Sequence, residues 1–257
     1  MPKINITTKP LTAFSETASR VSFGATAVFF ILFVALHFIE PEFDPSWRFI
    51  SEYQLGRYGW LMSIAFLSLM VSAGSLFLAV RSQIRTVGGY FGLFLLCVSG
   101  LGFGLAGIFT SDSITATTAT THGKVHTIAA LLGGNISGAA YFLGWSLARN
   151  KAWASVRWSL VWITGLALAG NVASFWMQSM IVQAQAKFGP EVPVGWPNRV
   201  LIVAYAAWLM ALAWRVLQVC KSHSEAGAEK LEKKGTLDSG MGRGVSVAIN
   251  GDPSEPI

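Results

Sequence analysis

The sequence has few charged residues and only two cysteines. Charged residues make up 12% of its 257 residues, about half the share in an ordinary soluble domain, whereas 53% are hydrophobic. With a mean hydropathy of +0.51, this composition excludes a soluble globular protein, because so much apolar surface requires lipid. Cys97 and Cys220 lie at opposite expected depths in the membrane, so neither a disulfide framework nor a thiol redox site is predicted.

Six apolar runs of about twenty residues lie along the chain, and this is the length that an α-helix needs to cross a bilayer. Since a segment in hydrocarbon must pair its own backbone groups, runs of this length predict helices. The sequence therefore predicts an all-α polytopic membrane protein, a bundle of six transmembrane helices. The predicted spans are residues 21–39, 58–80, 88–109, 123–147, 156–181 and 198–219.

The basic residues near the helix ends predict the orientation of this bundle. If the chain starts on the cytoplasmic side, ten basic residues lie at cytoplasmic helix ends and five at the other ends, as the positive-inside rule expects. The sequence thus predicts that both the N and C termini lie on the cytoplasmic side. The predicted location is the plasma (inner) membrane. The ten are Lys3, Lys9, Arg20, Arg81, Arg85, Arg149, Lys151, Arg157, Arg215 and Lys221, and the five are Arg48, Arg57, Lys124, Lys187 and Arg199.

The net charge of +6 does not indicate nucleic acid, because the basic residues are scattered over helix ends, where anionic lipid head groups attract them. The predicted partner is the lipid bilayer. Both ends of the chain are polar and too poor in apolar residues to build a core. The predicted division is a cytoplasmic N-terminal segment (1–20), a transmembrane domain (21–220) and a disordered cytoplasmic tail (221–257).

Most other ionisable residues gather at the predicted extracytoplasmic helix ends, where His122 and His126 are four residues apart. On a helix both imidazoles project from one face, a spacing used by paired metal ligands. His37 would supply a third nitrogen to zinc, and Asp112, Glu52 or Ser51 would complete the shell around it. The alternative is that the histidines only hydrogen-bond at an interfacial helix start. These ionisable residues are His37, Glu40, Glu42, Asp44, Arg48, Glu52, Arg57, Asp112, His122, Lys124, His126 and Arg199.

Two further features suggest contacts with a ligand. Arg199 opens the sixth run, where an ion pair with Asp112 or Glu52 or an anionic head group would balance its charge. Asn171, Ser174 and Gln178 form a polar stripe at helical spacing on the fifth run. Such a stripe lines a substrate path or makes hydrogen bonds between helices.

Several segments resemble the membrane family catalogued as domain of unknown function 998. They are residues 37–45 (HFIEPEFDP) and 50–60 (ISEYQLGRYGW), which resemble its opening signature, and 107–112 (GIFTSD), 121–126 (THGKVH) and 195–199 (GWPNR), which resemble its Gly-x-Phe-Pro-Thr-Asp, Thr-x-x-Gly-x-x-His and Gly-x-x-x-Arg motifs. Thr110 stands in place of the family's proline. The resemblance spans about residues 20–220 and implies the fold and the location of a site, but no activity. The positions carried over are His37, Asp44, Ser51, Glu52, Gly56, Asp112, His126 and Arg199.

The histidine, serine and aspartate inventory is also similar to that of the alkaline ceramidase and adiponectin-receptor group of zinc hydrolases. That group has seven helices and a different chain order, so the similarity is an analogy between sites.

These observations predict an extracytoplasmic-face enzyme, a metal-assisted hydrolase of a lipid or lipid-linked substrate. His37, His122 and His126 would hold zinc, Asp112 or Glu52 would act as general base, and Arg199 would hold an anionic head group. The principal alternative is a small-molecule transporter, with Asn171 and Gln178 on the path. A membrane sensor or scaffold subunit is the third.

Overall fold

The computed structural model describes residues 11–185 and 187–242, with side chains described as far as Ser222 and for Glu225. All regular secondary structure in this part of the chain is helical. The α-helices are α1 (Ala13–Ile39), α2 (Gly59–Val80), α3 (Val87–Ile108), α4 (Thr121–Gly133), α5 (Ile136–Ala148), α6 (Arg157–Ala184) and α7 (Gly195–Gly242), and the short 3-10 helices are η1 (Ile50–Leu55), η2 (Arg81–Gln83) and η3 (Lys151–Val156).

Six stretches in the described residues are long and apolar enough to cross a membrane. They confirm the predicted all-α fold with six membrane-spanning helices. Each predicted span corresponds to one of them, and α4 and α5 together form the fourth. Which side of the membrane each terminus faces stays a prediction.

Two helices extend beyond the predicted spans. α1 begins at Ala13 instead of residue 21 because Thr12 caps it, its hydroxyl accepting a hydrogen bond from the N–H of Ser15 at 3.3 Å. α7 continues through Gly242, past the predicted end at residue 219. Residues 243–257 of the predicted disordered tail lie outside the described residues, and the division into three segments stays a prediction.

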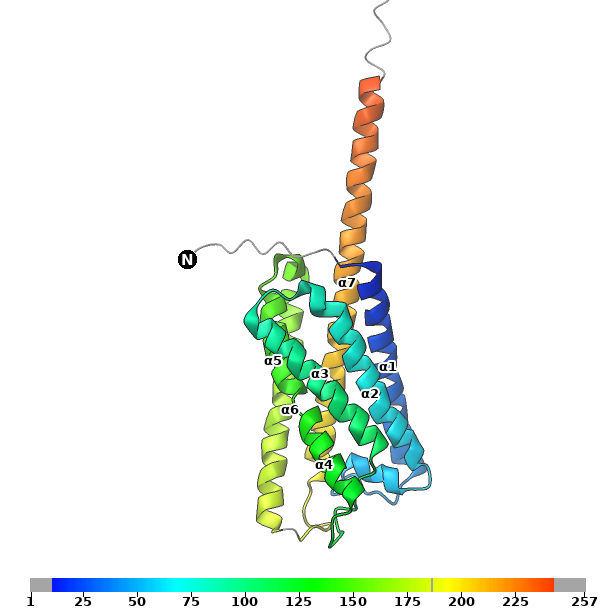
Figure 1. Cartoon of the computed structure of the whole chain (residues 1–257), viewed down its shortest axis with the longest axis vertical. Helices are drawn as coiled ribbons and strands as arrows, with labels where there is room; N and C mark the ends of the chain where they lie inside the picture. Colours follow the sequence, from blue (N-terminus) through cyan, green and yellow to red (C-terminus); the bar gives the residue numbers. More distant parts are fainter. Residues whose placement is uncertain (1–10, 186, 243–257) are drawn as a thin grey trace, which may run out of the picture.

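The helices form one bundle that α7 closes (Figure 1). α1, α2 and α3 pack on one another in chain order, and α7 lies between α1 and α6. The two halves of the fourth span have different neighbours: α4 packs on α3, whereas α5 packs on both α3 and α6. The first half of the fourth span therefore packs on fewer helices than the second half.

The fourth span is broken in its middle, where the sequence predicts one continuous helix over 123–147. α4 ends at Gly133 and α5 begins at Ile136, and adjacent glycines favour such a break because glycine is a poor helix former. The Asn135 side-chain amide donates to the carbonyl of Leu132 at 3.0 Å, and the Tyr205 hydroxyl donates to the carbonyl of Gly134 at 3.4 Å. These side chains add to the backbone hydrogen bonds that the two carbonyls accept across the break, from the N–H groups of Asn135 at 3.2 Å and Ser137 at 3.4 Å.

Hydroxyl groups join α1 to α2 inside the bundle. Ser72 lies 3.0 Å from the Ser22 hydroxyl and 2.7 Å from the Thr26 hydroxyl, and all three side chains are fully buried. Such contacts each contribute about 0.6 kcal/mol in membrane proteins. They fix the side of α1 that faces the bundle.

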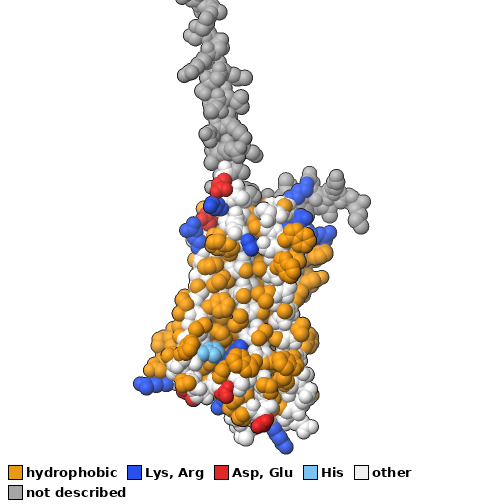
Figure 2. All heavy atoms as spheres, turned by 180° about the vertical axis from the view of Figure 1, so that it is seen from behind, with side chains coloured by type: hydrophobic (Ala, Val, Ile, Leu, Met, Phe, Trp, Pro, Cys, Tyr) orange, Lys and Arg blue, Asp and Glu red, His pale blue; other side chains and the backbone are white. Residues whose placement is uncertain are grey.

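The lateral surface is apolar, with Lys and Arg beyond it at both ends (Figure 2). The largest exposed side chains on α6 are aromatic: Trp158 is 75% exposed, Trp162 77% and Phe175 77%. Exposed apolar area of this extent requires a lipid environment. The chain is therefore a multi-pass membrane protein.

Candidate functional site

Apart from Asn171, near the middle of α6, the predicted site residues lie toward the end of the bundle opposite the start of α1, which we call the distal end. It consists of the connections 40–58, 109–120 and 187–194 with the adjoining helix ends. The ionisable side chains there form two groups of contacts. One surrounds Arg199 and Glu52, and the other surrounds the start of α4.

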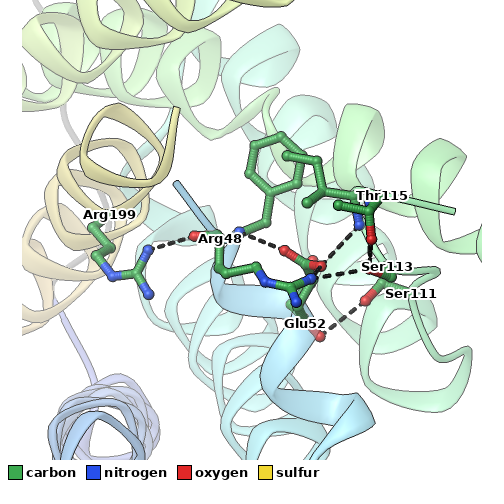
Figure 3. A network of polar contacts seen from close by, with 9 residues as sticks. Arg48, Glu52, Ser111, Ser113, Thr115 and Arg199 are labelled. Carbon is green, nitrogen blue, oxygen red and sulfur yellow. Dashed lines mark hydrogen bonds and ion pairs between the residues drawn. The ribbon is translucent and has the colours of Figure 1, made fainter. Parts of the chain in front are cut away.

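Arg199 is a buried cation that donates to neutral groups. It is 4% exposed, and its guanidinium donates to Nε2 of His37 at 2.9 Å, to the carbonyls of Arg48 at 2.7 Å and Gly195 at 3.2 Å, and to the Tyr53 hydroxyl at 3.3 Å. The contact with the Arg48 carbonyl is visible in Figure 3. Arg199 thereby connects α1, the 40–58 connection and α7.

The predicted ion pair of Arg199 with Asp112 or Glu52 is wrong. Among the described residues, no carboxylate lies within ion-pair distance of Arg199, and Glu52 pairs instead with Arg48. Burial raises the pKa of Tyr53, so its phenol stays neutral beside the guanidinium. The positive charge is stabilised by oriented dipoles in direct contact and, at longer range, by the carboxylates of Asp44 and Glu52.

Both ring nitrogens of His37 are occupied. Nδ1 lies 2.7 Å from the carbonyl of Phe33, and since a carbonyl only accepts, Nδ1 carries the proton. Nε2 then accepts the hydrogen bond from Arg199. His37 has no lone pair left for a metal ion.

Glu52 joins the 40–58 connection to the 109–120 connection (Figure 3). Its carboxylate is fully buried. One oxygen accepts from Arg48 at 2.7 Å and from the N–H of Ile114 at 2.8 Å, and the other accepts from the N–H of Phe49 at 2.9 Å. Arg48 also donates to the Ser113 hydroxyl at 3.0 Å. The carboxylate predicted to act as general base is thus enclosed by protein donors.

Two glycines let a carboxylate approach the start of a helix. Glu40, at the end of α1, accepts the N–H of Tyr58 just before α2, and a Cβ at Gly56 would overlap that carboxylate. Similarly, a Cβ at Gly123 in α4 would overlap the carboxylate of Asp112. The need for glycine at both positions follows from this lack of space.

Asp112 holds the start of α4. It accepts from the N–H of Thr120 at 2.8 Å and from its hydroxyl at 2.7 Å, and these hydrogen bonds hold the pKa of Asp112 below its usual value. The Thr120 hydroxyl in turn accepts from the N–H of Gly123 at 3.0 Å. Counted back from Gly123 and His126, the Thr-x-x-Gly-x-x-His spacing begins at Thr120, the residue that caps α4, and not at Thr121.

We expect Gly123→Ala to destabilise the protein by about 2 kcal/mol, because the new methyl group displaces Asp112 from Thr120. In the Asp112→Ala background the same change should stabilise by up to about 1 kcal/mol, since alanine is the better helix former. Equilibrium unfolding of the two single variants and the double variant measures this reversal. Gly165→Ala, at a helical glycine with open space around it, is the control, and an equal effect of Gly123→Ala in both backgrounds would contradict the contact.

His126 lies one turn further along α4 and is 6% exposed. Its Nδ1 lies 2.7 Å from the Phe109 carbonyl, so Nδ1 carries the proton and Nε2 carries the lone pair. The ring also packs edge-on against Phe66, with centroids 5.9 Å apart. His126 is thus held in one orientation and one tautomer.

Two adjoining cavities meet at His126. The inner cavity, of about 270 Å³, is mostly apolar and extends along α4 to the helix break, between α3, α6 and α7. The outer cavity, of about 830 Å³, includes the polar 111–119 segment, with Asp112, and Lys124. Residues lining both are Ser51, His126, Thr127, Ala130, Met177 and Asn198.

Of the other predicted site residues, some line a cavity and some do not. Gln178 and Ser174 line the inner cavity, whereas Asn171 is not among its lining residues. Ser51 lines both cavities, and its carbonyl accepts from the Ser111 hydroxyl at 2.9 Å. Asp44 forms a local turn by accepting from the N–H of Ser46 at 2.8 Å.

The three histidines do not form a common ligand set. His122 is exposed, with its ring 5.4 Å from that of Phe109, while His37 is used by Arg199. Among the described residues there is no group of three or more His, Cys, Asp or Glu side chains that could hold a metal ion. This arrangement does not fit a three-histidine zinc site.

The sequence did not single out two polar residues that shape this end. Asn198 accepts from the N–H of Ile50 at 3.0 Å and lines both cavities. Gln54 donates to the Ala106 carbonyl at 2.9 Å and accepts from the N–H of Ser111 at 3.2 Å. Gln54 lies in segment 50–60 and Asn198 in segment 195–199, the segments that resemble the family. Their place in these segments was the signal that could have identified them.

A protein-family model described as "Protein of unknown function (DUF998)" matches residues 23–215. No curated protein and no solved structure matches the chain.

Proposed function

The chain belongs to the family described as "Protein of unknown function (DUF998)", and we propose that it binds an amphipathic molecule, a lipid or lipid-linked compound, in the two cavities at its distal end. The observation that carries the proposal is one mostly apolar space, shared by the two cavities, with acidic and basic side chains only in its outer part apart from His126. The inner cavity offers apolar side chains such as Phe103, Leu201 and Ile202. The outer cavity offers Asp112, Lys124 and several hydroxyl groups.

Such a space suits a ligand with an apolar body and a polar head. An inner volume of about 270 Å³ holds roughly nine methylene groups, if each takes about the 30 Å³ of a water molecule. The head group would lie near His126, whose Nε2 lone pair accepts a hydrogen bond. Asn198 and Gln178 provide further polar contacts at this level.

The packing of α4 supports entry from the lipid. α4 packs on α3, and α6 packs on α5 and α7, yet α4 and α6 both line the inner cavity. We propose that the ligand passes between α4 and α6, so that its apolar part never crosses water. The predicted location in the plasma (inner) membrane, with the distal end extracytoplasmic, would give access to the outer leaflet.

Metal-assisted hydrolysis is not part of the proposal, because both ring nitrogens of His37 and the carboxylates of Glu52 and Asp112 are engaged with other groups. Transport is the second candidate. The broken fourth span borders the inner cavity at Gly133 and Gly134, and interrupted helices line the substrate sites of many transporters. A sensor would use the same cavity without moving the ligand across the membrane.

Filling the cavity tests the proposal. Ala130 lines both cavities, so Ala130→Trp should lower labelling of Met177-containing peptides at least about fivefold, a loss of about 1 kcal/mol in binding. The probe is a phospholipid with a diazirine in one acyl chain, incorporated in nanodiscs, and labelling is read by peptide mass spectrometry.

Ala169→Trp is the matched control, because Ala169 is an exposed alanine of α6 that is not among the cavity-lining residues. It should leave labelling of the same peptides unchanged. Equal labelling in the Ala130→Trp and Ala169→Trp proteins would reject the cavity as a ligand site, provided that both variants keep the wild-type melting temperature.

A further inference from the structure

A groove of about 680 Å³ lies away from the distal end, between α2 and α3. One side is a single face of α3, where residues recur at intervals of three and four. The other side comes from the end of α2 and the turn that follows it. The lining residues are Tyr90, Leu93, Phe94 and Cys97 of α3, with Phe77, Arg81, Ser82 and Arg85.

The two arginines of this groove have no acidic partner in α2, α3 or the turn between them. Arg81 and Arg85 are both exposed, and neither forms an ion pair within the described residues. The chain has no acidic residue between Glu52 and Asp112. The guanidinium of Arg85 donates only a long hydrogen bond, of 3.4 Å, to the neighbouring Ile84 carbonyl. Two cations therefore lie together without an anion.

A hydroxyl donor accompanies them. The Ser82 side-chain oxygen is buried and has no hydrogen-bond partner among the described residues, which is uncommon because a buried polar group without a partner costs about 1–3 kcal/mol. It lies between the two arginines in the chain and lines the same groove. An oxygen-rich anion would satisfy all three donors.

The rest of the groove is apolar. Phe77 lies one turn before Arg81, and Leu93 and Phe94 face it from α3. Cys97 is ten residues into α3, or about 15 Å along its axis. The groove thus runs from the basic helix ends well into the depth of the hydrocarbon layer.

We propose that this groove binds an anionic glycerophospholipid of the leaflet at that end. The phosphate pairs with Arg81 and Arg85, whose guanidinium groups match phosphate geometry, and accepts a hydrogen bond from Ser82. One acyl chain lies on Phe77, Leu93 and Phe94. Tyr90, 53% exposed, lies where aromatic rings anchor at the head-group level.

Native mass spectrometry of the detergent-purified protein tests this site. Titration with phosphatidylglycerol and with phosphatidylcholine of identical acyl chains should show at least about a tenfold preference for the anionic lipid at the first bound position. The Arg81→Gln/Arg85→Gln variant should lose that preference. The variant replaces two exposed side chains, so its melting temperature should match that of the wild type.

The control removes the same charge elsewhere at the same end. Arg149 and Arg157 are exposed and flank the turn between α5 and α6, outside the groove. Arg149→Gln/Arg157→Gln should keep the preference. An equal loss in both double variants, or none in Arg81→Gln/Arg85→Gln, overturns the proposal. So does displacement of the lipid by an equal concentration of free glycerol phosphate, since the acyl chain would then contribute nothing.

Discussion

Arg199→Met is expected to lower the free energy of unfolding by about 3 kcal/mol. The change leaves acceptors at His37, Tyr53 and two backbone carbonyls without the guanidinium donor, which is itself 4% exposed. Each buried group left unpaired costs about 1 kcal/mol or more. Unfolding in mixed micelles, followed by circular dichroism, measures the loss.

Two further variants separate the charge of Arg199 from its geometry. Arg199→Lys keeps the charge but presents three donors from one nitrogen, which cannot reach acceptors on α1, α7 and the 40–58 connection at once. We expect it to recover less than half of the lost stability. Arg57→Met, at an exposed arginine of the same end, should change stability by at most about 0.5 kcal/mol. If Arg199→Met costs no more than Arg57→Met, the buried contacts do not stabilise the fold.

The membrane spans could be predicted because each depends on the hydrophobicity of about twenty consecutive residues and not on distant contacts. A run of about twenty apolar residues has few alternatives to a membrane helix, so six runs gave six spans. The break at Gly133–Asn135 was missed for the same reason: hydropathy measures transfer to lipid and does not report helix continuity. At the break, the Gly134 carbonyl accepts a hydrogen bond from Tyr205 of α7, a partner 71 residues away in sequence.

The sequence also predicted that the ionisable residues gather at one end of the bundle, but it did not assign the contacts there. Ionisable residues are costly within hydrocarbon, so their clustering at helix ends was readable. Which donor meets which acceptor depends on the paths of three connections. Glu52 pairs with Arg48 four residues away, whereas Arg199 meets His37 across 162 residues of sequence. The zinc prediction depended on free histidine nitrogens, and only the folded chain reveals that both nitrogens of His37 are occupied.

Glu52→Ala should be the second strongly destabilising change, with a loss of about 4 kcal/mol. Removing one partner of a buried ion pair leaves the other partner without compensation, and here the Ile114 N–H of the 109–120 connection also loses its acceptor. Glu52→Gln should lose about half as much, because its amide group keeps one accepting oxygen but places a donor against either Phe49 or Arg48 and Ile114. Equilibrium unfolding at neutral pH compares the two variants.

Glu42→Ala and Glu42→Gln are the matched controls, since Glu42 is an exposed glutamate of the same connection; both should be close to wild type in stability. The pattern distinguishes a structural role of Glu52 from the general-base role that its position first suggested. A catalytic carboxylate tolerates glutamine in the fold and loses turnover, whereas an enclosed carboxylate loses stability in proportion to the hydrogen bonds removed. Wild-type stability in Glu52→Gln would return Glu52 to the candidates for catalysis, because its oxygens would then be free of the contacts that enclose them.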